Sequence, residues 1–222
     1  MTWFVLVPGM NHGGWWYRPI VEELAAHGHV GDAVTLAGLD PDGPPAPDAN
    51  LDTHIDDVVR VLDARDGAAV LVGHSYAGSV ISGAAELRPE KVQALVYLDA
   101  FVPEDGESAW TMTNDEEREW YIDGAGADGL GVAPLPFFDE RARPHPLGTL
   151  IQKSRLPGRW RTVPRKHYVA AVGAEWLPHT PFAGLTQRLE MDPDFTVHRV
   201  DSRHNFLAHG TDLLMGELLP FG

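Results

Sequence analysis

One hexapeptide constrains the fold of this chain more than any other feature. Gly73-His74-Ser75-Tyr76-Ala77-Gly78 lies between the apolar run Ala68–Val72, typical of a buried strand, and small residues that favour a closely packed helix ending at Leu87. A serine with small residues two positions before and after it, in such a strand–turn–helix, is typical of a nucleophile elbow. The motif reads G-x-S-x-A, and alanine is the smallest alternative to the second glycine. We therefore interpret Ser75 as a candidate nucleophile.

Strand and helix patterns alternate along most of the chain. This alternation implies right-handed βαβ crossovers and a mostly parallel sheet with helices on both faces, which is an α/β architecture. The expected strands are Trp3–Val7, Val30–Leu36, Ala68–Val72, Val92–Leu98, His167–Val172 and Phe195–Val200, and the other expected helices are Trp15–His27, Leu51–Ala64, Phe182–Leu189 and Leu207–Leu219.

The alternation fails between residues 103 and 164, a stretch rich in Gly, Pro, Trp and acidic residues. We predict that residues 1–102 and 165–222 form one core and that residues 103–164 form an inserted lid. A chain of 222 residues is long enough for one domain with a large core.

Composition excludes several classes of function. The net charge of −15 disfavours nucleic acid and anionic lipid as partners, and the lack of cysteine excludes disulfides, thiolate metal sites and a cysteine nucleophile. No apolar run approaches the roughly 20 residues of a membrane span, and the N-terminus lacks the basic start of a secretory signal. We expect a cytoplasmic protein that acts on a small molecule without a metal, with a homodimer as one option for its oligomeric state.

A serine hydroxyl is a weak nucleophile until a base removes its proton, and imidazole does this best near neutral pH. Among eleven histidines, His204 follows the last predicted strand, which is where the base of a strand–elbow–helix architecture is expected. His74 lies inside the elbow, where its ring cannot reach Ser75 with the right geometry. Surface or structural roles fit the remaining candidates that we weighed, which are His27, His29, His54 and His198.

An oxyanion hole needs two preorganised backbone N–H groups. Tyr76 follows the candidate nucleophile, and Met10 lies in the glycine-rich loop 8–14 after the first predicted strand. We expect these two residues to supply the donors. Candidate pocket residues are Asn11, His12, Trp15, Trp110, Trp120 and Phe137. For the aromatic residues of the lid, the equal alternative is that they pack against one another as a small core of the lid.

These motifs resemble the α/β-hydrolase superfamily, and within it the branch of plant methyl esterases, hydroxynitrile lyases and their bacterial relatives. The matching pieces are Phe4-Val-Leu-Val-Pro-Gly, His12-Gly-Gly-Trp, Val72-Gly-His-Ser-Tyr-Ala-Gly, Leu95-Val-Tyr-Leu-Asp-Ala-Phe-Val-Pro-Glu-Asp-Gly and His204. The resemblance implies an α/β-hydrolase fold and a Ser–His–acid hydrolase without a cofactor. Pro8 departs from the histidine usual in the family, a change that the backbone donor should survive.

The acid of the triad has two candidates. The family's usual acid follows the penultimate strand, and here Glu175 is the only carboxylate near that position. Asp99 ends the predicted strand Val92–Leu98, where haloalkane dehalogenase relatives place their acid. Because an acid from either strand end can hold the far side of the same imidazole, both remain open, and we prefer Asp99.

We therefore predict a serine hydrolase that cleaves a carboxylic ester, lactone or thioester of a small apolar or aromatic substrate through an acyl-enzyme on Ser75. Gly9 and Asn205 stand where hydroxynitrile lyases of this branch carry threonine and lysine, which favours an esterase over a lyase. The alternatives are a cofactor-free biosynthetic enzyme of the lyase or cyclase type and a receptor-like protein that binds its ligand on the same fold.

Overall fold

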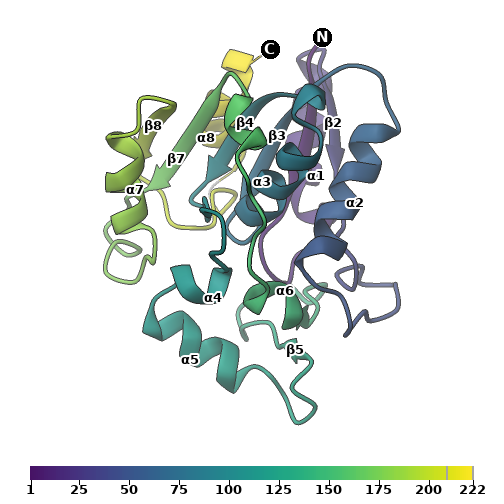
Figure 1. Ribbon diagram of the computed structural model, residues 1–222, viewed down its shortest axis with the longest axis vertical. Coiled ribbons are helices and arrows are strands. Elements are labelled where there is room, and N and C mark those ends of the chain that lie inside the picture. The colour runs from purple at the N-terminus through teal and green to yellow at the C-terminus, as the bar shows by residue number, and fades with distance from the viewer. Residues whose placement is uncertain (209, 222) are drawn as a thin grey trace.

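The computed structural model describes residues 1–208 and 210–221, and its centre is a six-stranded parallel sheet (Figure 1). The strand order is β2-β1-β3-β4-β7-β8, and each neighbouring pair is parallel. This arrangement confirms the predicted α/β class with a mostly parallel sheet. The six strands are β1 (Trp3–Val7), β2 (Val30–Ala33), β3 (Ala69–His74), β4 (Val92–Leu98), β7 (Lys166–Ala171) and β8 (Phe195–Val200).

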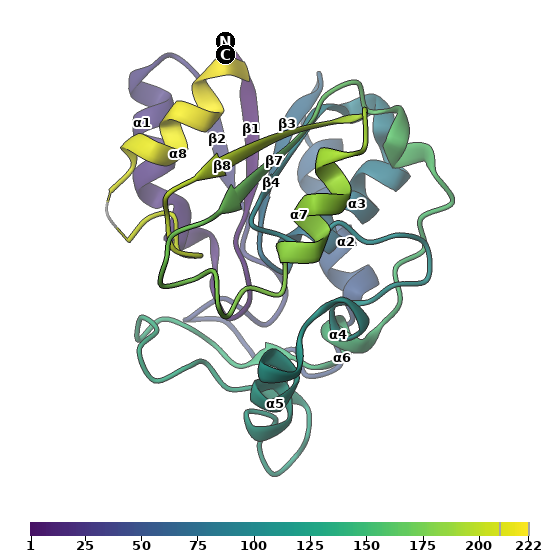
Figure 2. The ribbon, with the colours of Figure 1, turned by 90° about the vertical axis from the view of Figure 1, so that its left-hand side faces the viewer.

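Helices cover both faces of the sheet (Figure 2). The helices α1 (Arg18–Ala26) and α8 (Asp212–Leu218) lie on one face, and α2 (Leu51–Asp63), α3 (Ala77–Leu87) and α7 (Ala183–Glu190) lie on the other. Short 3-10 turns occupy Gly14–Tyr17, Pro89–Lys91, Arg159–Thr162 and Leu219–Phe221.

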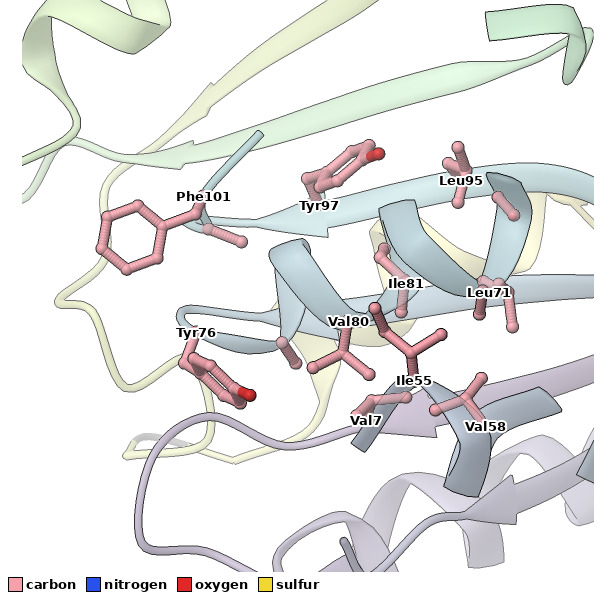
Figure 3. Packing of buried hydrophobic residues seen from close by; sticks show 14 of the residues in the cluster. Val7, Ile55, Val58, Leu71, Tyr76, Val80, Ile81, Leu95, Tyr97 and Phe101 are labelled. Carbon is pink, nitrogen blue, oxygen red and sulfur yellow. The ribbon is translucent and has the colours of Figure 1, made fainter. Parts of the chain in front are cut away.

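The strands carry apolar side chains on both faces because both faces are covered. In β1, Val5 and Val7 join the core under α2 and α3, while Phe4 and Leu6 join the core under α1 and α8. Figure 3 shows Val7 with Ile55 of α2 in the first of these layers. The continuous apolar runs of the sequence are therefore the central strands.

Three predicted boundaries were wrong by three residues or more, whereas the others agree with the structure to within two residues. The strand expected over Val30–Leu36 ends at Ala33, and the helix expected from Trp15 begins as a 3-10 turn, with α1 starting at Arg18. Pro19 lies in the first turn of α1, where its missing N–H breaks no helical hydrogen bond. The last helix begins at Asp212 rather than Leu207, because the Leu207 N–H donates to the side chain of Asn205 in a turn instead.

The segment 103–164 lies beyond the carboxyl ends of the strands over residues 109–151 in both views, and then runs back beside α3 to the 3-10 turn Arg159–Thr162 (Figures 1 and 2). It contains α4 (Ala109–Met112), α5 (Asp115–Asp123), β5 (Gly131–Val132), β6 (His145–Pro146) and α6 (Gly148–Ile151), and β5 and β6 form a small antiparallel pair. This placement puts the segment over the edge of the sheet at which Ser75 lies.

Candidate active site

Ser75 lies at a sharp bend between β3 and α3 with a left-handed φ of 56°. Close backbone approach explains the small residues around it: a Cβ on Gly78 would lie 1.9 Å from the carbonyl oxygen of Phe101, and one on Gly73 would lie 2.9 Å from that of Ala77. A non-glycine residue holds this conformation only where its surroundings over-determine it. The local geometry is that of a nucleophile elbow.

His204 is held by a buried carboxylate. Its Nδ1–H donates to Oδ2 of Asp99 at 2.7 Å, which leaves Nε2 as the proton acceptor of a neutral ring. Asp99 is 1% exposed, and its carboxylate also accepts from the indole N–H of Trp176 at 2.7 Å and from the backbone N–H of Ala171 at 3.3 Å. These three donors replace the water that an ionised carboxylate loses on burial.

Three aromatic groups fix the ring plane and the loop of His204. The indole of Trp176 stacks on the His204 ring with centroids 4.7 Å apart, and Phe182 lies at 5.9 Å. The ring of His74 lies 4.5 Å away and donates its Nε2–H to the His204 backbone carbonyl at 2.9 Å. Burial holds the pKa of His74 well below its usual range, so this donor is a neutral imidazole that anchors the loop to the elbow.

Ser75 and His204 line the same cavity, which has a volume of about 920 Å³. This volume suits a small organic molecule. Of the residues predicted for the pocket and the oxyanion hole, the cavity is lined by Met10, His12, Trp15, Trp120 and Phe137.

Two predicted pocket residues lie elsewhere. Asn11 is fully buried and does not line the cavity. It has a left-handed φ of 64°, and its side-chain amide donates to the carbonyls of Val132 and Arg143 at 2.9 and 2.8 Å. Trp110 lines a second cavity of about 490 Å³ between α4, α5 and α6. Asn11 therefore ties the first loop to segment 103–164, and Trp110 packs within that segment.

The alternative acid, Glu175, lies at the mouth of the cavity. Its side chain is 70% exposed and pairs with Arg203, whereas His204 directs its Nδ1–H to Asp99. The structure thus brings Asp99, and not Glu175, to the imidazole.

Met10 and Tyr76 flank the elbow. Tyr76 is the residue before α3, and Met10 lies in a turn closed by a hydrogen bond from the His12 N–H to the Gly9 carbonyl. Within residues 1–208 and 210–221, no hydrogen bond uses the backbone N–H of either Met10 or Tyr76. Both groups therefore lack a partner within the described residues, and the N-terminal end of α3 adds a positive dipole at Tyr76.

Two buried histidines form hydrogen bonds to Tyr76 and to the loop that carries Met10. His54 donates its Nε2–H to the Ala37 carbonyl at 3.0 Å, so its Nδ1 accepts from the Tyr76 hydroxyl, also at 3.0 Å. Burial lowers the pKa of His54 to about 4, which keeps the ring neutral and the tautomer fixed.

His145 likewise holds the loop after β1, which carries Met10, by a hydrogen bond. Its Nδ1 accepts from the Asn11 backbone N–H at 3.3 Å, and its Nε2–H donates to the Thr149 hydroxyl at 2.9 Å. Burial holds the pKa of His145 well below its usual range. The loop that carries Met10 is thus bonded to β6 and α6 through one neutral imidazole.

Several residues of this site escaped the sequence reasoning. Trp176 follows the predicted strand His167–Val172, and nothing in its spacing marks an indole N–H as a donor to an acid. Glu117, which lines the cavity, is hidden in an acidic run of α5. No three His, Asp or Glu side chains in the described part of the chain are grouped as metal ligands would be.

Comparisons with known proteins identify the family of this chain. The model of the alpha/beta hydrolase family matches residues 4–216, and the chain belongs to this family. A carbendazim hydrolyzing esterase from Nocardioides sp. (strain SG-4G) is 30% identical over the full length of both chains. Methylesterase 1 of Arabidopsis thaliana is 35% identical over 46% of this chain and 40% of its own.

Solved structures share the fold. An extracellular α/β-hydrolase from a Paenibacillus species superposes with a TM-score of 0.81 at 22% identity, covering 99% of this chain and 98% of its own. A pyrethroid hydrolase from Sphingobium faniae JZ-2 has a TM-score of 0.76 at 20% identity and covers 99% and 96%. These similarities confirm the expected α/β-hydrolase fold, and the sequence relatives place the chain among esterase-type hydrolases. No helix within the described residues is long and apolar enough to cross a membrane.

Proposed function

We propose that this protein hydrolyses carboxylic esters through an acyl-enzyme on Ser75, with His204 as the base and Asp99 as the acid. The observation that carries the proposal is the 2.7 Å hydrogen bond from His204 Nδ1–H to Asp99. Because that bond fixes the proton on Nδ1, Nε2 is ready to accept a proton in the cavity that Ser75 also lines.

The reaction proceeds in two stages. His204 Nε2 takes the Ser75 proton as Oγ attacks the ester carbonyl, the backbone N–H groups of Met10 and Tyr76 stabilise the oxyanion, and the imidazolium protonates the departing alcohol. A water molecule then attacks the acyl-serine with His204 again as base, and the acid product leaves with Ser75 restored. Asp99 keeps the tautomer and stabilises the imidazolium without taking the proton itself.

The cavity favours a flat, largely apolar acyl or alcohol group. Its walls carry the indoles of Trp15, Trp16 and Trp120 and the rings of Phe137 and Phe138. The relative named for hydrolysing carbendazim supports aryl esters and carbamates as the substrates to test first.

The test is steady-state hydrolysis of p-nitrophenyl acetate, methyl benzoate and carbendazim by the wild type and by Ser75→Ala. We expect sustained turnover that Ser75→Ala abolishes and that Ser79→Ala retains. Ser79 is the matched control because it lies in α3 four residues after Ser75, does not line the cavity, and carries a buried hydroxyl that has no hydrogen-bond partner among the described residues. A single stoichiometric burst without turnover would instead favour the receptor-like alternative, and turnover that survives Ser75→Ala would refute the proposal.

A further inference from the structure

Four carboxylates line the active-site cavity, and one of them differs from the rest. Glu116 pairs with His179, Asp139 with Arg141, and Glu175 with Arg203. The fourth, Glu117, has no Lys, Arg or His nitrogen within 4.0 Å among the described residues. Among the described residues, it is therefore the cavity carboxylate that has no ion-pair partner.

Glu117 is held in place by neutral hydroxyls. Its Oε2 accepts from Thr113 and from Tyr121, the latter at 3.3 Å, while neither hydroxyl contacts Oε1. The side chain is partly buried, and burial raises the pKa of the carboxyl group. An ionised oxygen in such a place is under-solvated, and a donor from a bound molecule would stabilise it.

His12 gives the same cavity a second acceptor. Its Nδ1–H donates to the Met10 carbonyl at 2.7 Å, so Nε2 of the neutral ring carries a lone pair that no donor among the described residues uses. Burial lowers the pKa of His12, which favours that neutral form. The ring lies between Phe138 and Trp15, with centroids 4.9 and 5.3 Å away, so an acceptor sits among flat apolar walls.

We propose that the active-site cavity selects substrates in which an aromatic ring beside the ester carries an N–H donor, and that Glu117 on α5 is the residue that accepts from it. This inference rests on the proposed ester hydrolysis and names its substrate class. The oxyanion hole supplies donors to the carbonyl oxygen, whereas Glu117 and His12 supply acceptors to the rest of the molecule. An aromatic amine or an N–H heterocycle satisfies both, and a purely hydrocarbon ring leaves Glu117 without a charge-assisted partner.

The experiment compares isosteric pairs of substrates, methyl 3-aminobenzoate against methyl 3-methylbenzoate and the corresponding 4-substituted pair. The wild type, Glu117→Gln, Glu117→Leu and the control Glu119→Gln are assayed for kcat/KM. Glu119 is an exposed residue of the same helix that does not line the cavity. For at least one ring position, we expect the amino-to-methyl ratio of kcat/KM to fall about tenfold in Glu117→Leu and by less in Glu117→Gln, which keeps an acceptor oxygen. Glu119→Gln should keep the wild-type ratio.

Equal losses on both members of each pair in the Glu117 variants would overturn the inference, since a residue that only supports α5 affects both alike. A wild-type enzyme with no amino preference at either ring position would overturn it as well. Equilibrium binding of the same esters to Ser75→Ala, measured by calorimetry, separates this inference from the proposed reaction. An amino preference in binding that Glu117→Leu removes supports donor recognition even if the wild type hydrolyses neither ester.

Discussion

Acidification should destabilise this protein through histidines that the fold keeps neutral. His54, His74 and His145 are buried, and burial lowers the pKa of each. In the unfolded chain the same groups titrate near 6.5. At a pH between the lowered pKa of the folded state and about 6.5, the unfolded state binds more protons than the folded state. The contribution of these neutral histidines to the free energy of unfolding is therefore fully present above about pH 6.5 and is lost as the pH falls below it.

The size of the effect follows from His54, whose pKa of about 4 in the fold compares with about 6.5 in the unfolded chain. Lowering the pH from 7 to 5 removes about 2 kcal/mol of unfolding free energy through this one group. His74 and His145 add losses in the same direction. Against a typical total of roughly 5–15 kcal/mol, the folded protein is expected to lose much of its stability by pH 5.

Urea denaturation at pH 5 and pH 7 tests this reasoning. Glutamine can accept from the Tyr76 hydroxyl and donate to the Ala37 carbonyl but does not titrate, so His54→Gln should lose about 2 kcal/mol less than the wild type between the two pH values. The exposed histidine His27 provides the control, and His27→Gln should keep the wild-type difference. An unchanged pH difference in His54→Gln, with a cooperative transition, would show that His54 does not stay neutral in the fold.

The remaining predictions concern the acid and the elbow. Asp99→Asn should lower kcat for p-nitrophenyl acetate by about 10³–10⁴, because the amide no longer fixes the imidazole tautomer, while Glu175→Gln should change it less than about twofold; the opposite ranking would move the acid to Glu175. Gly78→Ala should cost about 2 kcal/mol or more in urea denaturation, because its Cβ would lie 1.9 Å from the Phe101 carbonyl oxygen. Gly216→Ala, a helical glycine with nothing within 4 Å of its Cβ, should instead stabilise by about 0.5–1 kcal/mol.

The sequence was sufficient for the parts of the fold that local patterns determine. Buried strands read as continuous apolar runs, and the small residues around Ser75 follow from backbone contacts that leave no room for a side chain. The boundary of the last helix was missed because the chain forms a turn at Asn205, in which the Leu207 N–H donates to the Asn205 side chain and the Ala208 N–H donates to the Asn205 carbonyl.

Roles that depend on distant segments could not be read from the chain. Asn11 was expected in the pocket because it lies beside Met10, yet its side chain bonds to Val132 and Arg143, more than a hundred residues away. His54 was expected to have a surface or structural role, and only the fold places it against the Tyr76 hydroxyl. The tautomer of a buried histidine is fixed by its hydrogen-bond partners, and only the tertiary structure brings those partners together.

The ambiguity of the acid has a structural origin in the sheet itself. Asp99 directly follows β4 and has a left-handed φ of 42°, and its carboxylate accepts from the N–H of Ala171, the last residue of the neighbouring strand β7. A carboxylate directly after β4 therefore lies close to the position that a carboxylate directly after β7 would occupy. The segment after β7 supplies a donor instead, the indole of Trp176, which both bonds to Asp99 and stacks on His204. Because β4 and β7 are adjacent and parallel, an acid at the carboxyl end of either strand can reach the same imidazole, and in this chain Asp99 carries that role while Trp176 holds its carboxylate.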